Sequence, residues 1–502
     1  MSVTIRIGRE YLAQLAGIVV LLADRVVLTA ILLRAWGVEA FAQWSVAAAA
    51  AGLVALFDFG LNLYFSNRLT FSVEQNKMRR ARHAYRAGNL LVALAAVIAT
   101  LAICAGFWLF GDRFVDTGVD AELLWTVAAL VLATATRYAL AVHYYLYRAH
   151  RQFERQTYLI AATDLVRVVA AGVAVLLGGG LLEAALAYLA GALISSFPLA
   201  LLDARRRFPE FRYGMELPNR AERRVIPPVA LGFWAQSVPI TIVTFLPVFV
   251  LAAIGAGANA IAQFVLIRTL ANLARMGPQL IGTVLGQEAG RRFGRRDHEG
   301  MFLVYREGCK ILAAQSAGAA GVILALARPV FDLWTDNGHL YSDPLLWLAI
   351  APLALGPSLV LANAVFGHAN HPAAMVKGRL IQLGLTAAAY VALPVVDPAL
   401  RMMAALAIGE LIGFGVPAYL GVRKLIPEAG PAFMLDLLIR ISVSATLCYA
   451  AAALTYALLP PSLVSLALAC LAGGGAILLM TFLIGLEPGR RAILLSAARR
   501  FV

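Results

Sequence analysis

Long apolar stretches, separated by short polar segments, follow one another along the whole chain. A helix of about 20 apolar residues crosses the hydrocarbon core of a bilayer and pairs its own backbone groups there without water. This pattern predicts fourteen membrane-spanning helices, at residues 11–33, 41–66, 87–110, 121–147, 158–177, 181–202, 229–254, 260–286, 308–327, 344–367, 373–396, 398–420, 433–458 and 462–486. The division between the eleventh and twelfth is the weakest, because only residues 396–398 interrupt the apolar pattern. We therefore expect an all-α polytopic membrane protein.

Composition and charge place the polar segments relative to the membrane. Of the 502 residues, 61% are hydrophobic and 14% are charged, whereas a soluble protein carries about 25% charged residues. The formal charge of +14 does not indicate nucleic-acid binding, because 32 of the 42 Lys and Arg residues lie in segments between spans and at span ends on one side, and only four lie on the other. The count of 32 includes Lys377 and Arg379 in segment 368–380. This bias predicts cytoplasmic termini, and the first span lacks a small-residue cleavage site, so we expect no removed signal peptide.

An internal repeat occurs at an offset of 220 residues. Residues 40–44 (AFAQW) align with 260–264 (AIAQF), and 85–88 (YRAG) align with 305–308 (YREG). We therefore predict three regions: an N-terminal lobe at 1–225 (spans 1–6), a C-terminal lobe at 226–428 (spans 7–12), and spans 13 and 14 with a basic cytoplasmic tail at 429–502. Halves of six spans share an orientation, and transporters built this way bind substrates near the repeat interface.

The first span carries two charges near its middle, Asp24 and Arg25. Such charges cost roughly 2.5–3.5 kcal/mol each at a helix centre and usually face a protein interior or a wet cavity. At about 100° per residue, Gln14 and Thr29 share their side of the helix. Adjacent helical positions diverge, so we expect Asp24 and Arg25 not to face each other.

The eighth span carries a polar stripe. Arg268, Asn272, Arg275 and Gln279 are spaced i, i+4, i+7 and i+11, which places them on one helical face. A face with two arginines and two amides does not suit lipid, so we expect it to line an internal cavity. One alternative is a static scaffold in which these arginines pair with acids on neighbouring helices. The other is a cationic lining for an anionic substrate, since the guanidinium fork suits phosphate oxygens.

The remaining charges within spans are few. Asp164 and Arg167 are spaced i, i+3 in span 5 and are able to pair on one helix, and Arg137 lies in span 4. Asp58 lies near the inner end of span 2, where it caps the helix, pairs with a loop arginine or binds a cation. Glu410 in span 12 lacks a local partner, so it either carries a proton or pairs with an arginine on another span.

Span 7 combines prolines with hydroxyl side chains. Pro239 and Pro247 kink a helix, and Thr241, with Ser237 and Thr244, either satisfies the freed carbonyls or lines a cavity. Pro352 and Pro357 in span 10 repeat this pattern.

The sequence offers no sign of an enzyme. HExxH, GxSxG and GxxxxGK[ST] motifs are absent, and the four cysteines are dispersed without metal-like spacing. We therefore expect neither a catalytic site nor a metal or other cofactor.

Residues 33–69 (LRAWGVEAFAQWSVAAAAAGLVALFDFGLNLYFSNRL) carry a family resemblance. A short outer turn with glycine, an aromatic-serine span and Asp-Phe-Gly-Leu before a basic loop resemble the O-antigen and exopolysaccharide repeat-unit flippases. These form the Wzx-type branch of the multidrug/oligosaccharidyl-lipid/polysaccharide (MOP) exporter superfamily. The layout of two six-helix halves plus two helices agrees with it over the whole chain.

The resemblance implies a MATE-like fold and alternating access in a bacterial inner membrane. It also implies an undecaprenyl-pyrophosphate-linked oligosaccharide as the substrate and a polysaccharide polymerase and chain-length machinery as partners. Arg25, Arg268 and Arg275, with Arg137, are then the expected pyrophosphate ligands. Sugar hydroxyls would meet the side chains of Gln14, Thr241, Asn272 and Gln279.

Cation counter-movement at Asp24, Asp58 or Glu410, or the membrane potential acting on the arginines, would drive transport. Alternatives are a drug or organic-cation antiporter of the same superfamily, a lipid II flippase, and a membrane polysaccharide polymerase or ligase. Mid-span arginines outnumber the acids, which argues against the first, and the short outer loops argue against the last.

Overall fold

The computed structural model describes residues 13–14, 16–111, 121–294, 297–335, 340–356, 361–362, 372–394, 397–426 and 428–486. The predicted cytoplasmic termini, Pro357 and most of the second half of span 10 lie outside these residues. The chain forms two compact units, Met1–Ala262 (unit 1) and Gln263–Val502 (unit 2). The predicted boundaries at 225 and 428 stay a prediction.

All regular elements of the described residues are helices, which confirms the predicted all-α class. Those that begin in unit 1 are η1 (Ala23–Leu28), α2 (Thr29–Gly52), η2 (Leu53–Asp58), α3 (Leu61–Glu74), α4 (Met78–Phe110), α5 (Ala121–Ala139), α6 (Ala141–Ala149), α7 (Phe153–Leu176), α8 (Leu181–Ser196), η4 (Phe197–Leu202), α9 (Asp203–Arg207), α10 (Arg220–Ala253) and α11 (Gly257–Gly294). Those in unit 2 are α12 (His298–Thr335), α13 (Asp343–Leu355), α15 (Pro372–Ala392), α16 (Pro398–Ile408), η6 (Gly409–Gly415), α17 (Val416–Leu425), α18 (Pro431–Ala457), α19 (Leu463–Met480) and η7 (Thr481–Gly485).

Each predicted span corresponds to a helix. Within the described residues, ten helical stretches are long and apolar enough to cross a membrane, and the first of them, Ala16–Asp58, contains two predicted spans divided at Gly37. The polar α11, the short α13 and α15 account for the other three. At the weakest predicted division, Asp397 caps α16 by accepting a hydrogen bond from the Leu400 backbone N–H at 2.7 Å.

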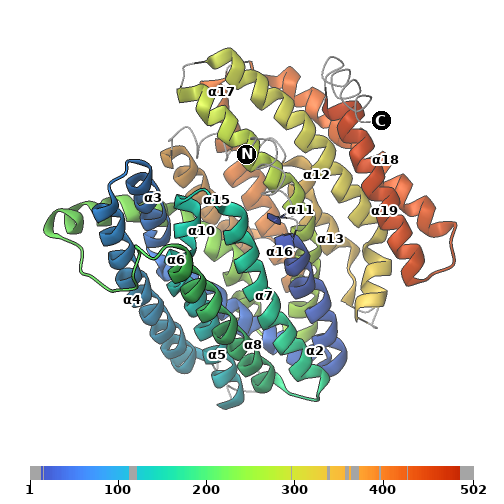
Figure 1. Ribbon diagram of the computed structural model, residues 1–502. Coiled ribbons are helices and arrows are strands. Elements are labelled where there is room, and N and C mark those ends of the chain that lie inside the picture. The colour runs from blue at the N-terminus through green and yellow to red at the C-terminus, as the bar shows by residue number, and fades with distance from the viewer. Residues whose placement is uncertain are drawn as a thin grey trace, which may run out of the picture. The chain divides into compact units, whose positions relative to one another are not determined.

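In unit 1, α7 packs against α8 and α8 against α5, as Figure 1 shows. Helix α10, which the repeat assigns to the second half, packs on α2, η2 and α3 of this unit. The Trp234 indole N–H donates to the Leu56 carbonyl at 2.5 Å, and its ring lies 5.7 Å from that of Phe59. The seventh predicted span is therefore part of the first compact unit.

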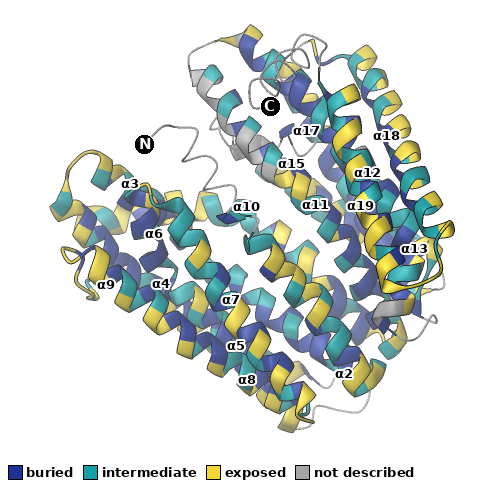
Figure 2. Ribbon diagram, turned by 45° about the vertical axis from the view of Figure 1, so that its right-hand side comes forward, coloured by how far each residue is buried: buried dark blue, intermediate teal, exposed yellow. Residues whose placement is uncertain are grey.

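In unit 2, α12 packs against α18 and α19. Buried and exposed positions alternate along these helices (Figure 2). Tyr305 and Leu312 of α12 lie in a buried apolar core, whereas Leu454 of α18 and Leu471 of α19 are 62% and 72% exposed. Large apolar side chains exposed in this way suit contact with lipid.

Candidate functional site

An ion pair joins two charged residues from different predicted spans of unit 2. Arg275 lies on α11 and Glu410 at the start of η6. The Nη1 and Nη2 atoms of Arg275 donate to Oε1 and Oε2 of Glu410 at 2.8 and 3.0 Å. A forked, charge-assisted pair of this kind is stronger than a neutral hydrogen bond. The sequence left two alternatives for Glu410, a proton carrier or a partner of an arginine on another span. In the structure Glu410 pairs with Arg275.

Arg379 belongs to the same cluster, and the sequence interpretation missed it. Counted there among loop cations, it lies within α15, and its guanidinium carbon is 3.8 Å from the centre of the Phe414 ring on η6. It donates to Gln382 at 2.7 Å and interacts electrostatically with Glu410 and Arg275. The signal in the sequence was the i, i+3, i+7 spacing of Arg379, Gln382 and Thr386, a polar stripe inside an apolar span.

Arg268 is the third arginine of this cluster. Its guanidinium carbon lies 5.6 Å from the Phe264 ring centre, and it interacts electrostatically with Arg275 and Glu410. Asn272 and Gln279, the amides of the predicted stripe, are exposed on the continuous helix α11. Three arginines against one glutamate leave this arginine cluster (Arg268, Arg275, Arg379 and Glu410) with a formal charge of +2.

Unit 1 contains a second charged group, which is close to balanced. Nη2 of Arg167 lies 2.9 Å from Asp164 on the same helix, as the spacing predicts, and Nη2 of Arg137 on α5 lies 3.4 Å from the same carboxylate. The Arg167 guanidinium also stacks over the Tyr188 ring at 5.0 Å. Arg137 is thus held by an acid within its own unit.

Asp24 and Arg25 are closer than expected, because Arg25 Nε lies 3.6 Å from Asp24 Oδ2. The expectation that they do not face each other is wrong for two reasons. The backbone at Ala23–Leu28 is a wider π-type turn instead of a regular α-helix, and the long arginine side chain reaches back. Asp24 also acts electrostatically on Arg167, which connects the first span to the Asp164 group.

Asp58 lies where span 2 breaks. Helix η2 ends at Asp58, Phe59 and Gly60 take left-handed φ values of 47° and 71°, and α3 begins at Leu61. Asp58 Oδ1 accepts hydrogen bonds from the backbone N–H of Asn62 at 3.3 Å and from its side-chain amide. Asp58 therefore caps α3 in the first of the predicted roles.

Of two other predicted ligands, Thr241 bonds within its own helix and Gln14 is partly exposed. Thr241 donates to the Ser237 carbonyl at 3.1 Å, so its hydroxyl serves the proline-containing helix α10. Gln14 is partly exposed before η1. Among the predicted site residues, unit 1 holds Gln14, Asp24, Arg25, Asp58, Arg137 and Thr241, and unit 2 holds Arg268, Asn272, Arg275, Gln279 and Glu410.

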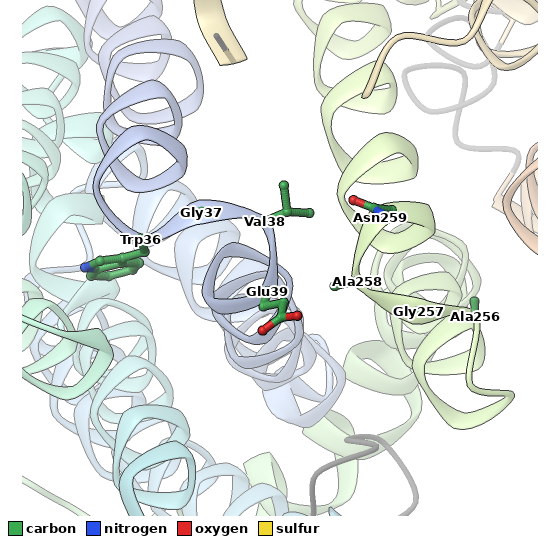
Figure 3. A pocket seen from close by; sticks show the side chains of 8 residues that line it. All are labelled: Trp36, Gly37, Val38, Glu39, Ala256, Gly257, Ala258 and Asn259. Atoms are coloured by element: carbon green, nitrogen blue, oxygen red, sulfur yellow. The ribbon is translucent and has the colours of Figure 1, made fainter. Parts of the chain in front are cut away.

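Two turns related by the 220-residue offset line one pocket of about 600 Å³ in unit 1. Gly37 and Gly257 have φ values of 77° and 78°. Figure 3 shows Val38 and Asn259 extending from the two turns into the space between them. The shared positive φ at these two positions agrees with the predicted repeat.

Solved structures with a similar arrangement are membrane transporters. An inward-facing multidrug resistance MATE family transporter of the MOP superfamily matches with a TM-score of 0.67 and 18% identity, over 82% of this chain and 94% of that one. The lipid II flippase MurJ, in an inward closed conformation, matches with a TM-score of 0.62 and 12% identity, over 95% and 98%. A mutant of the Vibrio cholerae MATE transporter VcmN matches with a TM-score of 0.56 and 14% identity, over 85% and 98%.

No family model and no curated protein matches the sequence. The likeness to these transporters extends over most of the chain at low sequence identity. The chain therefore has the fold that MATE transporters and the lipid II flippase MurJ share.

Proposed function

We propose that the protein is a flippase that moves a polyprenyl-pyrophosphate-linked oligosaccharide from the cytoplasmic to the outer leaflet of a bacterial inner membrane. The arginine cluster of unit 2 carries this proposal. A pyrophosphate diester has two acidic oxygens, both ionised at neutral pH, and the cluster has a formal charge of +2. Arginine forks are suited to phosphate oxygens in a site that excludes water.

In this proposal the pyrophosphate takes the place that Glu410 occupies on Arg275. Arg379 and Arg268 are close enough to add to the attraction, and the exposed amides Asn272 and Gln279 meet sugar hydroxyls. Arg25 and Arg137, the two ligands expected in unit 1, pair with Asp24 and Asp164 within that unit, and their part in pyrophosphate binding stays a prediction. The prenyl tail stays in the bilayer.

The driving force is a cation moving in the opposite direction, with Asp24, Asp58 and Glu410 as the carboxylates able to carry it. Glu410 is a candidate for this role because its carboxylate pairs with Arg275 inside the arginine cluster, next to the proposed position of the pyrophosphate. A polysaccharide polymerase and its chain-length machinery would use the product in the outer leaflet.

Substitution of the cluster arginines tests the substrate. In proteoliposomes with a fluorescently labelled polyprenyl-diphosphate oligosaccharide, we expect Arg275→Ala and Arg379→Ala each to lower the flipping rate roughly ten-fold or more, as expected when a charge-assisted contact of about 1.5–3 kcal/mol is lost. The rate is followed by the loss of label accessible to an outside quencher. Arg401→Ala, which removes an arginine stacked on Tyr390 outside the cluster, should leave the rate unchanged.

A charge exchange separates substrate binding from a static scaffold. The double variant Arg275→Glu with Glu410→Arg keeps one ion pair between the same helices but moves the guanidinium group from α11 to η6. We expect it to recover thermal stability without recovering transport. Recovery of both would reduce the pair to a structural role, and transport of cationic dyes or of lipid II in place of the oligosaccharide would assign a different substrate.

A further inference from the structure

The segment that connects α9 and α10, residues 208–219, contacts all three histidines of unit 1. Two of these contacts are ring stacks, His143 with Tyr213 and His150 with Phe208. The third histidine, His83, lies near the start of α4 in the predicted cytoplasmic segment 67–86, and its partners are carboxylates. His83 is therefore the one of the three whose bonding to the helix connection depends directly on its own charge.

Both ring nitrogens of His83 face a carboxylate. Nδ1 lies 3.1 Å from Oε2 of Glu216 in the connecting segment, and Nε2 lies 2.7 Å from Oε2 of Glu222 in the first turn of α10. An ionised carboxylate only accepts hydrogen bonds, and a neutral imidazole has one N–H and one lone pair. Only the charged imidazolium, with an N–H on each nitrogen, is therefore able to donate to both carboxylates.

The other charged groups around His83 leave these two contacts to the histidine. The titratable and charged groups that surround it are Arg86 of α4, Arg68 and Tyr64 of α3, Glu216 of the connecting segment and Glu222 of α10. Arg86 contacts Oε1 of Glu216, and Arg68 Nη2 lies 3.9 Å from Oε1 of Glu222. Each arginine thus faces the second oxygen of a carboxylate whose first oxygen faces His83.

The pKa of His83 gives the direction of the pH response. Burial acts to lower it, but the hydrogen bonds and charges of Glu216 and Glu222 together outweigh burial and raise the pKa above its usual value of 6.5. A raised pKa in the folded state means that His83 stabilises its contacts fully below about pH 6.5. This contribution is lost as pH rises through the raised value, so the attachment is stronger in mild acid than in alkali.

We propose that His83 is a pH-sensitive switch, which in its charged form joins both the connecting segment and the first turn of α10 to α4. In its neutral form it keeps one N–H and loses one of the two carboxylates. The side chain is 26% exposed, so the proton exchanges directly with water. On the predicted cytoplasmic side, this switch responds to cytoplasmic pH.

The switch acts on the seventh predicted span through the cap of its helix. Glu222 and Asn219 form the capping box of α10, in which each side chain accepts a hydrogen bond from the backbone N–H of the other residue. Protonated His83 holds this cap against α4, and neutral His83 weakens that attachment. This regulation of α10 does not depend on which molecule the protein transports.

Hydrogen exchange of the full-length protein in lipid nanodiscs tests the switch without any substrate. Backbone amides of residues 216–226 are compared between a variant and the wild type at the same pH, so the pH dependence of the exchange chemistry cancels. His83→Gln, which is neutral at every pH, should exchange roughly ten-fold faster than the wild type at about pH 5.5 and at a similar rate at about pH 9. His83→Arg, which stays charged and donates through a fork, should match the wild type at about pH 5.5 and exchange roughly ten-fold more slowly at about pH 9.

His150→Gln is the matched control, because His150 contacts the same segment by stacking on Phe208 and lies 3.9 Å from Glu210. Its exchange rate at 216–226 relative to the wild type should be the same at both pH values. An unchanged ratio for His83→Gln between the two pH values, or a His83→Arg rate equal to the wild type in alkali, would overturn the assignment. Because no lipid-linked oligosaccharide is present, the result is separate from the proposed transport.

Discussion

Gly60 shows how one residue determines the local structure at the break in span 2. Its φ of 71° lies in the left-handed region, and a Cβ at this position would lie 2.1 Å from the Ala230 carbonyl oxygen. Both conditions favour glycine, because it alone avoids the steric cost and permits the close approach of α10. The position of Asp58 at the end of η2 thus depends on glycine at position 60.

We expect Gly60→Ala to destabilise unit 1 by more than the roughly 1–3 kcal/mol of a strained backbone position, because the α10 contact must also shift. Gly106→Ala on α4 is the control, since a Cβ there meets nothing within 4 Å. It should be neutral or stabilising by about 0.5–1 kcal/mol. Thermal unfolding in the same detergent compares the two, and equal midpoints would contradict the role of Gly60.

The contacts of individual charged residues show which parts of the candidate site the sequence predicted. The stripe through Arg268 and Arg275 followed from helical spacing, and the pair of Asp164 with Arg167 followed from i, i+3 geometry. Spacing along one helix does not reveal partners on another, so the Arg275–Glu410 pair remained only an alternative. Arg379 was missed because positive charge near a span end was assigned to a loop.

At the scale of elements, the segment between α9 and α10 is held against the start of α4. Glu216 contacts Arg86 and lies 3.1 Å from His83 Nδ1, and its backbone N–H donates to the Arg86 carbonyl at 3.3 Å. Hydrogen bonds from Arg86 and then from His83 hold the pKa of Glu216 below its usual value of 4.5. The segment that connects spans 6 and 7 is thereby attached to unit 1 by charge.

A lowered pKa in the folded state means that ionised Glu216 stabilises this attachment above the ordinary glutamate pKa. The contribution is lost as pH falls below about 4.5 and through the lowered folded value. We expect Glu216→Gln to increase protease cleavage within 208–219 at neutral pH, and we expect this difference from wild type to shrink in acid. Glu210→Gln, which removes a longer 3.9 Å contact with His150, should have the smaller effect at neutral pH.

Irregular helix turns were the elements that sequence patterns did not predict. Asp24 and Glu410 both lie in π-type turns, η1 and η6. Assigning side chains to helix faces at 100° per residue assumes a regular α-helix. A wider turn changes which side chains face each other. The spans themselves were predicted well because their length and apolar character are set by the bilayer.

At the scale of the whole molecule, the 220-residue repeat has a backbone counterpart in Gly37 and Gly257. Their φ values differ by 1°. The sequence predicted that the segments around these two glycines are equivalent. Helix α10 packs on α2, η2 and α3 of unit 1, which ends at Ala262. Packing on Gly60 and Leu56 is a tertiary property that the repeat does not encode.

We expect Gly37→Ala and Gly257→Ala to lower stability by similar amounts, about 1–3 kcal/mol each, because each forces a side chain into a left-handed turn. Gly474→Ala in α19, where a Cβ meets nothing within 4 Å, is the control. Chemical denaturation in mixed micelles measures all three. Strongly unequal effects at the two turns would contradict their structural equivalence.

The packing of α10 has a consequence for synthesis at the ribosome. Its partners α2, η2 and α3 precede it in the chain, so all of them are already made when α10 enters the membrane. Domains generally fold from the N-terminal side as the chain grows. A seven-span intermediate is therefore able to complete the packing of α10 before the translocon receives the residues of the arginine cluster.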